Sequence, residues 1–170
     1  MMVPMFFVST FSIPIGTAMI PHLVVLRLKQ NQKSPQQFID ALVLFSTLFL
    51  LSIALLLLVF SSKIVDLVGV NFTPTAVTHG IGVMAIFLPI LVLSGLVIIA
   101  NSILNARNNF FIPGLLQLIV PVAAIGTLFV LKTNFGIFSV AIGMLAGQFL
   151  NLIFLLPAIK AHGFSLLPTF

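Results

Sequence analysis

Long apolar runs separated by short polar breaks dominate the pattern of this chain. Ala41–Phe60 contains no charged residue, and its length matches the roughly 20 residues that an α-helix needs to cross about 30 Å of hydrocarbon. Gly80–Ala100 is also free of charge. The pattern therefore predicts an all-α protein, a polytopic transmembrane helix bundle with about five membrane spans.

The predicted spans form a single transmembrane domain over residues 1–170. Ser34-Pro35 with Gln37 is a capping-box pattern, and Thr73-Pro74 combines a cap with a first-turn proline, so helices are expected to begin at both places. Residues 61–78 mix polar and apolar positions and are expected to lie at the membrane interface. The predicted helices cover about 3–28, 35–61, 74–106, 110–131 and 135–159.

One polar stretch, Asn101 to Pro113, interrupts the apolar second half of the chain. Asn101 and Asn105 are four residues apart and therefore share one face of a helix, with Arg107 just beyond them. Asn108 and Asn109 offer an N-cap, and Pro113 comes early in the next helix. These features predict a tight helix-turn-helix at the membrane surface.

The last predicted span carries its own polar and small residues. Gly143 and Gly147 have the spacing that lets another helix approach closely, and Gln148 and Asn151 can hydrogen-bond across such a contact. A packing seam is the main interpretation of these residues, and a substrate-facing patch is the alternative. The candidate substrate-binding residues are Asn101, Asn105, Arg107, Gln148 and Asn151.

Composition excludes a soluble fold. Hydrophobic residues make up 61% of the chain, charged residues 5%, and the mean hydropathy is +1.33, whereas soluble domains have roughly 25% charged residues. The net charge of +5 comes from basic residues spread over the ends of apolar segments, and a nucleic-acid site would need them clustered on one face. We therefore expect the lipid bilayer, and no nucleic acid, as a partner.

The residues that could carry chemistry are few and scattered. The chain has no cysteine, and His22, His79 and His162 are far apart, so no metal site is expected. The two carboxylates, Asp40 and Asp66, fall in regions predicted at opposite faces of the membrane, which argues against paired-carboxylate catalysis. No catalytic residue, no cofactor and no enzymatic activity are predicted.

The distribution of basic residues predicts an orientation through the positive-inside rule. The loop around Lys29, the turn at Arg107 and the C-terminal end lie on the richer side, and we expect that side to be cytoplasmic. An N-terminal span with an exported N-terminus suggests that a first helix is missing, and that the chain is a segment of a larger protein or an N-terminally short product. The richer side has Arg27, Lys29, Lys33, Arg107 and Lys160, and the other has Lys63 and Lys132.

The polar turn and the last span together resemble a known family. Leu104-Asn105-Ala106-Arg107, followed by Phe110 and Ile112-Pro113, resembles the turn between the fourth and fifth helices of the MurJ/MviN lipid II flippases. This family belongs to the multidrug/oligosaccharidyl-lipid/polysaccharide exporter superfamily. Further similar segments are Ala18–Pro21, Val68–Phe72, Gly143–Gly147 with Gln148, Leu156-Pro157 and Gly163.

The resemblance implies that the chain supplies the second to sixth helices of one lobe of a two-lobed bacterial inner-membrane transporter. Such a transporter moves the undecaprenyl-pyrophosphate-linked peptidoglycan precursor by alternating access, in the service of cell-wall biogenesis and cell shape. The implied partners are the lipid-linked glycan substrate, the missing first helix and the second lobe. One departure is clear: Phe7–Pro14 has no charge, and Ser12-Ile13-Pro14 stands where the family has Glu-Gly-Ala.

The family also has an arginine pair in its second helix, and because Phe7–Pro14 has no charge, no anion-binding residue is carried over from the resemblance. Cations of this kind hold a pyrophosphate by charge-assisted bonds. The leading hypothesis is a segment of a lipid II flippase. The alternatives are an exporter of another lipid-linked polysaccharide or of a drug, and a non-transporting membrane scaffold.

Overall fold

The structure, a computed structural model, describes residues 33–68 and 73–166, together with the isolated positions 6, 10, 14, 17, 18, 21 and 25. The predicted first span, 3–28, and the departures noted in Phe7–Pro14 therefore lie almost wholly outside the described residues. Within the described ranges every regular element is a helix and no strand is present. The helices are α3 (Lys33–Val59), α4 (Ser61–Val68), α5 (Pro74–Ala106), α6 (Phe111–Leu116), α7 (Ile119–Phe135) and α8 (Phe138–Ala161).

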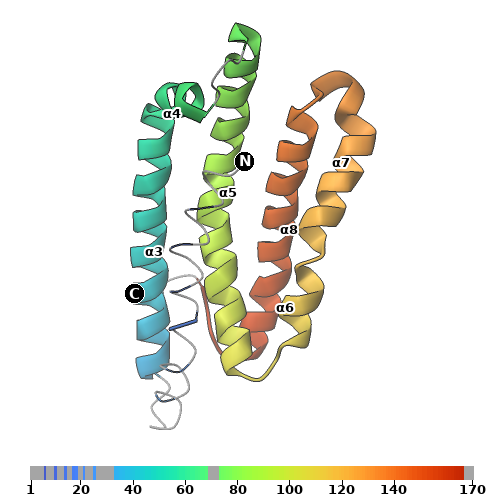
Figure 1. The fold of residues 1–170 in the computed structure, drawn as a ribbon. Helices are drawn as coiled ribbons and strands as arrows, with labels where there is room; N and C mark the ends of the chain where they lie inside the picture. The colour runs from blue at the N-terminus through green and yellow to red at the C-terminus, as the bar shows by residue number, and fades with distance from the viewer. Residues whose placement is uncertain are drawn as a thin grey trace.

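The long helices stand side by side in the order α3, α5, α8, α7 (Figure 1). The chain runs up α3, down α5, up α6 and α7, and down α8, so α5 and α8 are parallel neighbours (Figure 1). Four segments of the described chain are long and apolar enough to cross a membrane: 36–59, 75–106, 111–135 and 138–161. The predicted all-α transmembrane bundle is confirmed, and the proposed fifth span falls outside the described residues.

The central helix of this row is α5. In an apolar 18-residue stretch of α5, 61% of the residues are buried, whereas no residue is buried in the corresponding stretch within 111–135. Ile103 and Leu104 of α5 pack with Ile39 of α3 and Leu155 of α8 at one end of the bundle. On the outer helix α7, Phe129 and Val130 remain exposed. This exposure is expected of a surface that faces lipid, where apolar side chains need no protein cover.

The predicted single helix over 110–131 is two helices in the structure. A turn at Gln117–Leu118 separates α6 from α7. Pro121 explains the break, because it has no N–H for the carbonyl of Gln117 and its ring clashes with that carbonyl. Intrahelical bonding resumes at Val122, whose N–H donates to the Leu118 carbonyl at 3.1 Å.

The connection over 61–78 contains a helix that the sequence pattern did not predict. The Phe60 N–H donates to Leu56 at 3.0 Å and the Ile64 N–H donates to Phe60 at 2.9 Å, so hydrogen bonding continues through the turn from α3 into α4. The predicted start of the next helix is confirmed, since Thr73 Oγ1 accepts a bond from Ala76 N at 3.4 Å and Pro74 is the first helical residue.

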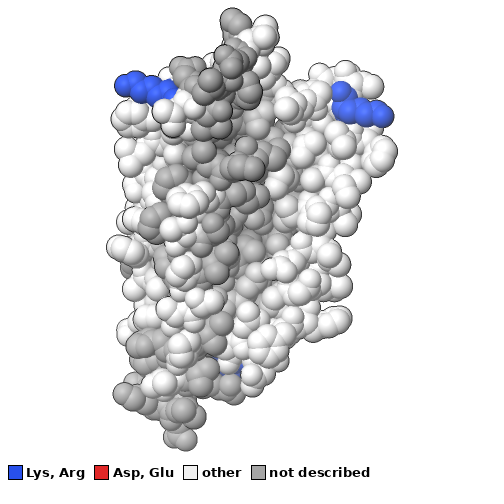
Figure 2. All heavy atoms as spheres, viewed as in Figure 1, with Lys and Arg blue, Asp and Glu red and all other residues white. Residues whose placement is uncertain are grey.

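Other boundaries differ from the predicted ranges by a few residues. α3 begins at Lys33 rather than residue 35 and ends at Val59 rather than 61, and α8 covers Phe138–Ala161 rather than 135–159. Helix α7 continues to Phe135, beyond the expected end at 131, and its C-cap is Gly136 with φ of 51°. In Figure 2 the visible Lys and Arg atoms lie near the two ends of the bundle, as the composition suggested.

Candidate functional site

Two polar side chains join the parallel spans α5 and α8. Gln148 donates from Nε2 to Ser94 Oγ at 2.6 Å, and Ser94 Oγ donates in turn to the Ile90 carbonyl at 2.7 Å. Ser94 is 8% exposed, so this pair lies inside the bundle. Gln148 therefore bonds across a contact between helices, as expected, but this contact is with α5 and is not the one that Gly143 and Gly147 make.

Several buried side-chain oxygens of α3, α5 and α8 have no hydrogen-bond partner in the described part of the chain. Asn151 follows Gln148 by three residues on α8 and is 3% exposed, yet its Oδ1 is unpaired. The same holds for Gln148 Oε1, Asn101 Oδ1 and, on α3, Thr47 Oγ1. A buried polar group without a partner costs about 1–3 kcal/mol. These acceptors are therefore positions where a water molecule or a donor group on a ligand would be favoured.

Arg107, another predicted candidate, is engaged with the end of α8. Its Nη2 donates to the carbonyl of His162 at 3.1 Å, and its guanidinium lies 4.9 Å from the centroid of the Phe164 ring. His162 is the C-cap of α8, where unpaired carbonyls attract a cation. In this structure Arg107 therefore holds two helix ends together.

The turn that contains Arg107 has the tight form that was predicted. Asn108 adopts a φ of 59°, which asparagine tolerates better than most residues. The N-cap of α6 is Phe110, and Asn109, one residue earlier, accepts a bond from Ile112 N at Oδ1 at 3.4 Å. The candidate Asn105 is half-buried, and its carbonyl accepts the Asn108 N–H at 3.0 Å.

Gly143 and Gly147 form a close contact between α8 and α7. A Cβ added to Gly143 would overlap Thr127 Oγ1 and would lie 2.7 Å from Ala124 Cα, and one added to Gly147 would lie 2.8 Å from Val120 Cα. Since real Cβ atoms essentially never come so close, α7 can take this position only against glycine. The partner of the seam is thus α7, on the face of α8 away from α5.

One connection at the end of the bundle was missed by the sequence reasoning. Gln36 of α3 donates from Nε2 to the Ser165 carbonyl at 2.9 Å and accepts the Ser165 N–H at Oε1 at 3.1 Å. Gln36 also contacts Asp40 Oδ1 at 2.6 Å. Gln36 and Ser165 are 129 positions apart in the sequence, and no local pattern indicates that they meet.

The described residues contain no group of three His, Cys, Asp or Glu side chains that could hold a metal ion. The His79 ring packs edge-on against Phe138 with centroids 5.7 Å apart, and His162 Nδ1 lies 2.7 Å from the Ala158 carbonyl. His22 lies outside the described residues. The described contact of His79 is thus aromatic packing, and that of His162 is a bond to a carbonyl of its own helix end.

The helices, their length and the position of the charged residues at their ends define a polytopic α-helical membrane protein. The family model "Lipid II flippase MurJ" matches residues 1–170. The chain belongs to the MurJ lipid II flippase family, which is a family of transporters, and the resemblance drawn from the sequence motifs is confirmed.

A solved structure has a similar fold. Lipid II flippase MurJ in an inward closed conformation superposes with a TM-score of 0.73 at 24% sequence identity. The match covers 93% of this chain and 34% of the solved chain, so the chain spans about a third of that flippase. No curated protein matches the chain.

Proposed function

We propose that this chain forms part of a transporter that moves lipid II, a lipid-linked glycan, across the bacterial inner membrane by alternating access. The observation that carries the proposal is the match of the MurJ family model over all of residues 1–170. The chain corresponds in this proposal to most of one lobe. A preceding helix and a second lobe complete the transport path.

In the proposed orientation, the end of the bundle with the α5–α6 turn faces the cytoplasm. The start of α3 and the end of α8 lie at this same end (Figure 1). Lys33, Arg107 and Lys160 belong to it, while Lys63 and Lys132 belong to the opposite end. The excess of basic residues supports a cytoplasmic position through the positive-inside rule.

Among the candidate residues, we propose that Asn101, Gln148 and Asn151 contact polar groups of the substrate during the transport cycle. Their unpaired carbonyl oxygens support this role, because glycan hydroxyls and amide N–H groups are donors. Asn105 shares the helix face of Asn101 and is proposed as a weaker contact. The contacts of Arg107 with His162 and Phe164 favour a structural role at the end of α8 over a role in substrate binding.

A second candidate function is export of a different lipid-linked polysaccharide. It is favoured by the neutral character of the buried polar side chains in the described spans, which are amides and hydroxyls. A pyrophosphate is held most strongly by cations, so on this alternative the substrate is recognised through its sugars.

Depletion of the protein in its own cells would test the proposed function. Lipid II is expected to accumulate on the cytoplasmic side of the membrane, and its fraction accessible from outside is expected to fall. Re-expression of the parent protein should restore that fraction, and the Asn151→Leu variant should restore less of it at equal abundance. Unchanged lipid II exposure, with loss of another surface polysaccharide, would instead establish the second candidate.

A further inference from the structure

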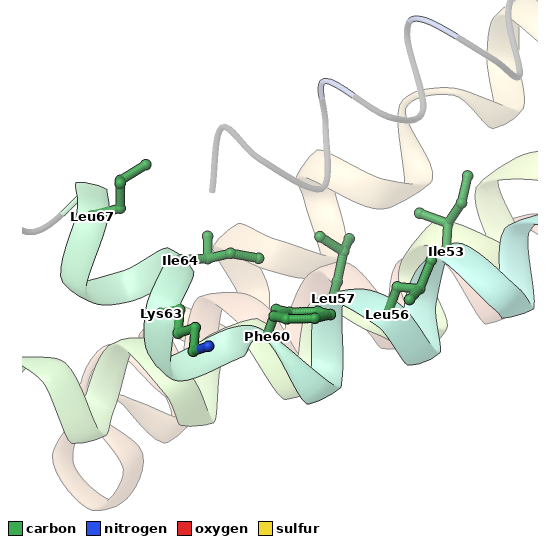
Figure 3. Close-up of a pocket in the computed structure, with 7 residues that line it drawn as sticks. All are labelled: Ile53, Leu56, Leu57, Phe60, Lys63, Ile64 and Leu67. Carbon is green, nitrogen blue, oxygen red and sulfur yellow. The ribbon is translucent and has the colours of Figure 1, made fainter.

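A cavity of about 450 Å³ lies where the last turns of α3 meet α4 (Figure 3). Six of its seven lining residues are apolar and the seventh is a lysine. The lining residues are Ile53, Leu56, Leu57, Phe60, Lys63, Ile64 and Leu67. The cavity therefore combines a hydrocarbon surface with a single positive charge.

The floor of this cavity is buried and its walls are open. Ile53 and Leu57 are 9% and 6% exposed, whereas Leu56 and Leu67 are 58% and 81% exposed. The lining residues follow one side of α3 and continue onto α4 (Figure 3). Among the described residues the open side of the groove is apolar, and the apolar group that a membrane offers to such a surface is an acyl chain.

The charge lies where the apolar surface ends. Lys63 is exposed and its Nζ lies 5.8 Å from the centroid of the Phe60 ring. Phe60 is the turn residue at which the span 36–59 is complete, so Lys63 is placed at the level of the lipid head groups. A lysine at this level keeps its ammonium in the polar layer while its stem covers apolar surface. The Lys63 ammonium is therefore complementary in charge to the phosphate of a lipid head group, which lies at the same depth in the membrane.

From this combination we propose that the α3–α4 groove binds one anionic phospholipid. An acyl chain fills the groove over Ile53 and Leu57, and the phosphate contacts the Lys63 ammonium. The negative charge of phosphatidylglycerol fits one cation better than the zwitterionic head group of phosphatidylcholine does. This site is distinct from the polar α5–α8 contact, and the proposal does not depend on the transported substrate.

Quenching by brominated lipids would test the proposal, because the chain contains no tryptophan or tyrosine. The Phe60→Trp variant places one fluorophore in the groove and retains an aromatic ring beside Lys63. In phosphatidylcholine nanodiscs, phosphatidylglycerol with brominated acyl chains is expected to reach half-maximal quenching at about one-fifth of the mole fraction that brominated phosphatidylcholine needs. A factor of five corresponds to about 1 kcal/mol for one basic residue near anionic lipid.

The variants are compared in the Phe60→Trp background. Lys63→Gln is expected to abolish the fivefold preference, and Lys63→Arg to keep it. Lys132→Gln is the matched control, because Lys132 is also exposed, lies at the same end of the bundle and is remote from the groove. Circular dichroism of each variant, compared with the parent, measures whether the helical content is retained.

Three results would overturn the proposal. Equal quenching by the two brominated lipids in the parent would show that the groove has no preference for anionic lipid. A preference that survives Lys63→Gln, or that Lys132→Gln reduces equally, would assign the effect to general surface charge. Full competition by soluble glycerol phosphate would show that the groove contributes nothing and that the lysine binds free phosphate.

Discussion

Gln148 of α8 and Ser94 of α5 are joined by a hydrogen bond of 2.6 Å between two parallel spans. Ser94 Oγ uses its own hydrogen for the Ile90 carbonyl, so the Gln148 amide is the donor and Ser94 the acceptor. The bond lies in the interior of the bundle, since Ser94 is buried. It couples the central helix to the helix that carries the unpaired Asn151 oxygen.

The first prediction concerns this bond. Gln148→Leu and Ser94→Ala are each expected to lower the free energy of unfolding in detergent, with a coupling energy of about 0.6 kcal/mol and at most about 1.7 kcal/mol, the range found between membrane helices. A double-mutant cycle measures it. Ser52→Ala is the control, because the Ser52 hydroxyl donates to the Phe49 carbonyl within its own helix. Additive effects of the two substitutions would contradict the assignment.

The second prediction concerns the α7–α8 contact. Gly143→Ala is expected to lower the free energy of unfolding by about 1–3 kcal/mol, because the new methyl group overlaps Thr127 and the Ala124 backbone. Thermal unfolding in detergent measures the change. Gly126→Ala on α7 meets no heavy atom within 4 Å and should be neutral or stabilising by up to about 1 kcal/mol. A similar loss in both variants would mean that the close contact is not the cause.

The third prediction concerns the end of α8. Arg107→Gln is expected to lower the free energy of unfolding by about 1 kcal/mol, since it removes a cation from helix-end carbonyls and from the Phe164 ring. Cleavage near Phe164 by a protease should become faster. Lys160→Gln removes an exposed charge from the same end and should change neither measurement by a comparable amount. Equal effects of the two substitutions would point to net charge instead of the contact.

The fourth prediction concerns orientation. The chain has no cysteine, so a single introduced thiol reports one position. Ala106→Cys, in the last residue of α5, is expected to react with an impermeant maleimide only after the cells are opened. Thr133→Cys, exposed near the end of α7, should react in intact spheroplasts. The reverse pattern would place the α5–α6 turn outside and would invert the proposed topology.

Much of the fold could be predicted from local chemistry. The uncharged run Ala41–Phe60 predicts a span because its length alone matches the hydrocarbon thickness. Thr73-Pro74 predicts the start of α5 because a cap and its helix lie within four residues of each other. The helix α4 was not predicted, because its start depends on how hydrogen bonding continues from α3 across the turn at Phe60. The break at Gln117–Leu118 was not predicted either, although Pro121 is its local cause.

The candidate site could be predicted only in part. The spacing of Gly143 and Gly147 predicted a close contact without naming the helix that makes it, and Gln148 was recognised as a group that bonds across helices without its partner Ser94. The prediction for Arg107 left open whether it is an anchor or a binding residue. Its position beside His162 follows from the meeting of two chain segments 55 residues apart.

The sequence by itself determined that this chain crosses a membrane several times, where its polar breaks fall and which family it belongs to. Hydropathy, capping and motif order are properties of neighbouring residues and are readable without coordinates. Only the tertiary structure decided that α5 lies between α3 and α8, that α7 covers the glycines and that Gln36 meets Ser165. In a bundle whose helices are nearly uniformly apolar, any of them could pack against any other, and the choice among partners depends on close steric fit and a few long-range hydrogen bonds.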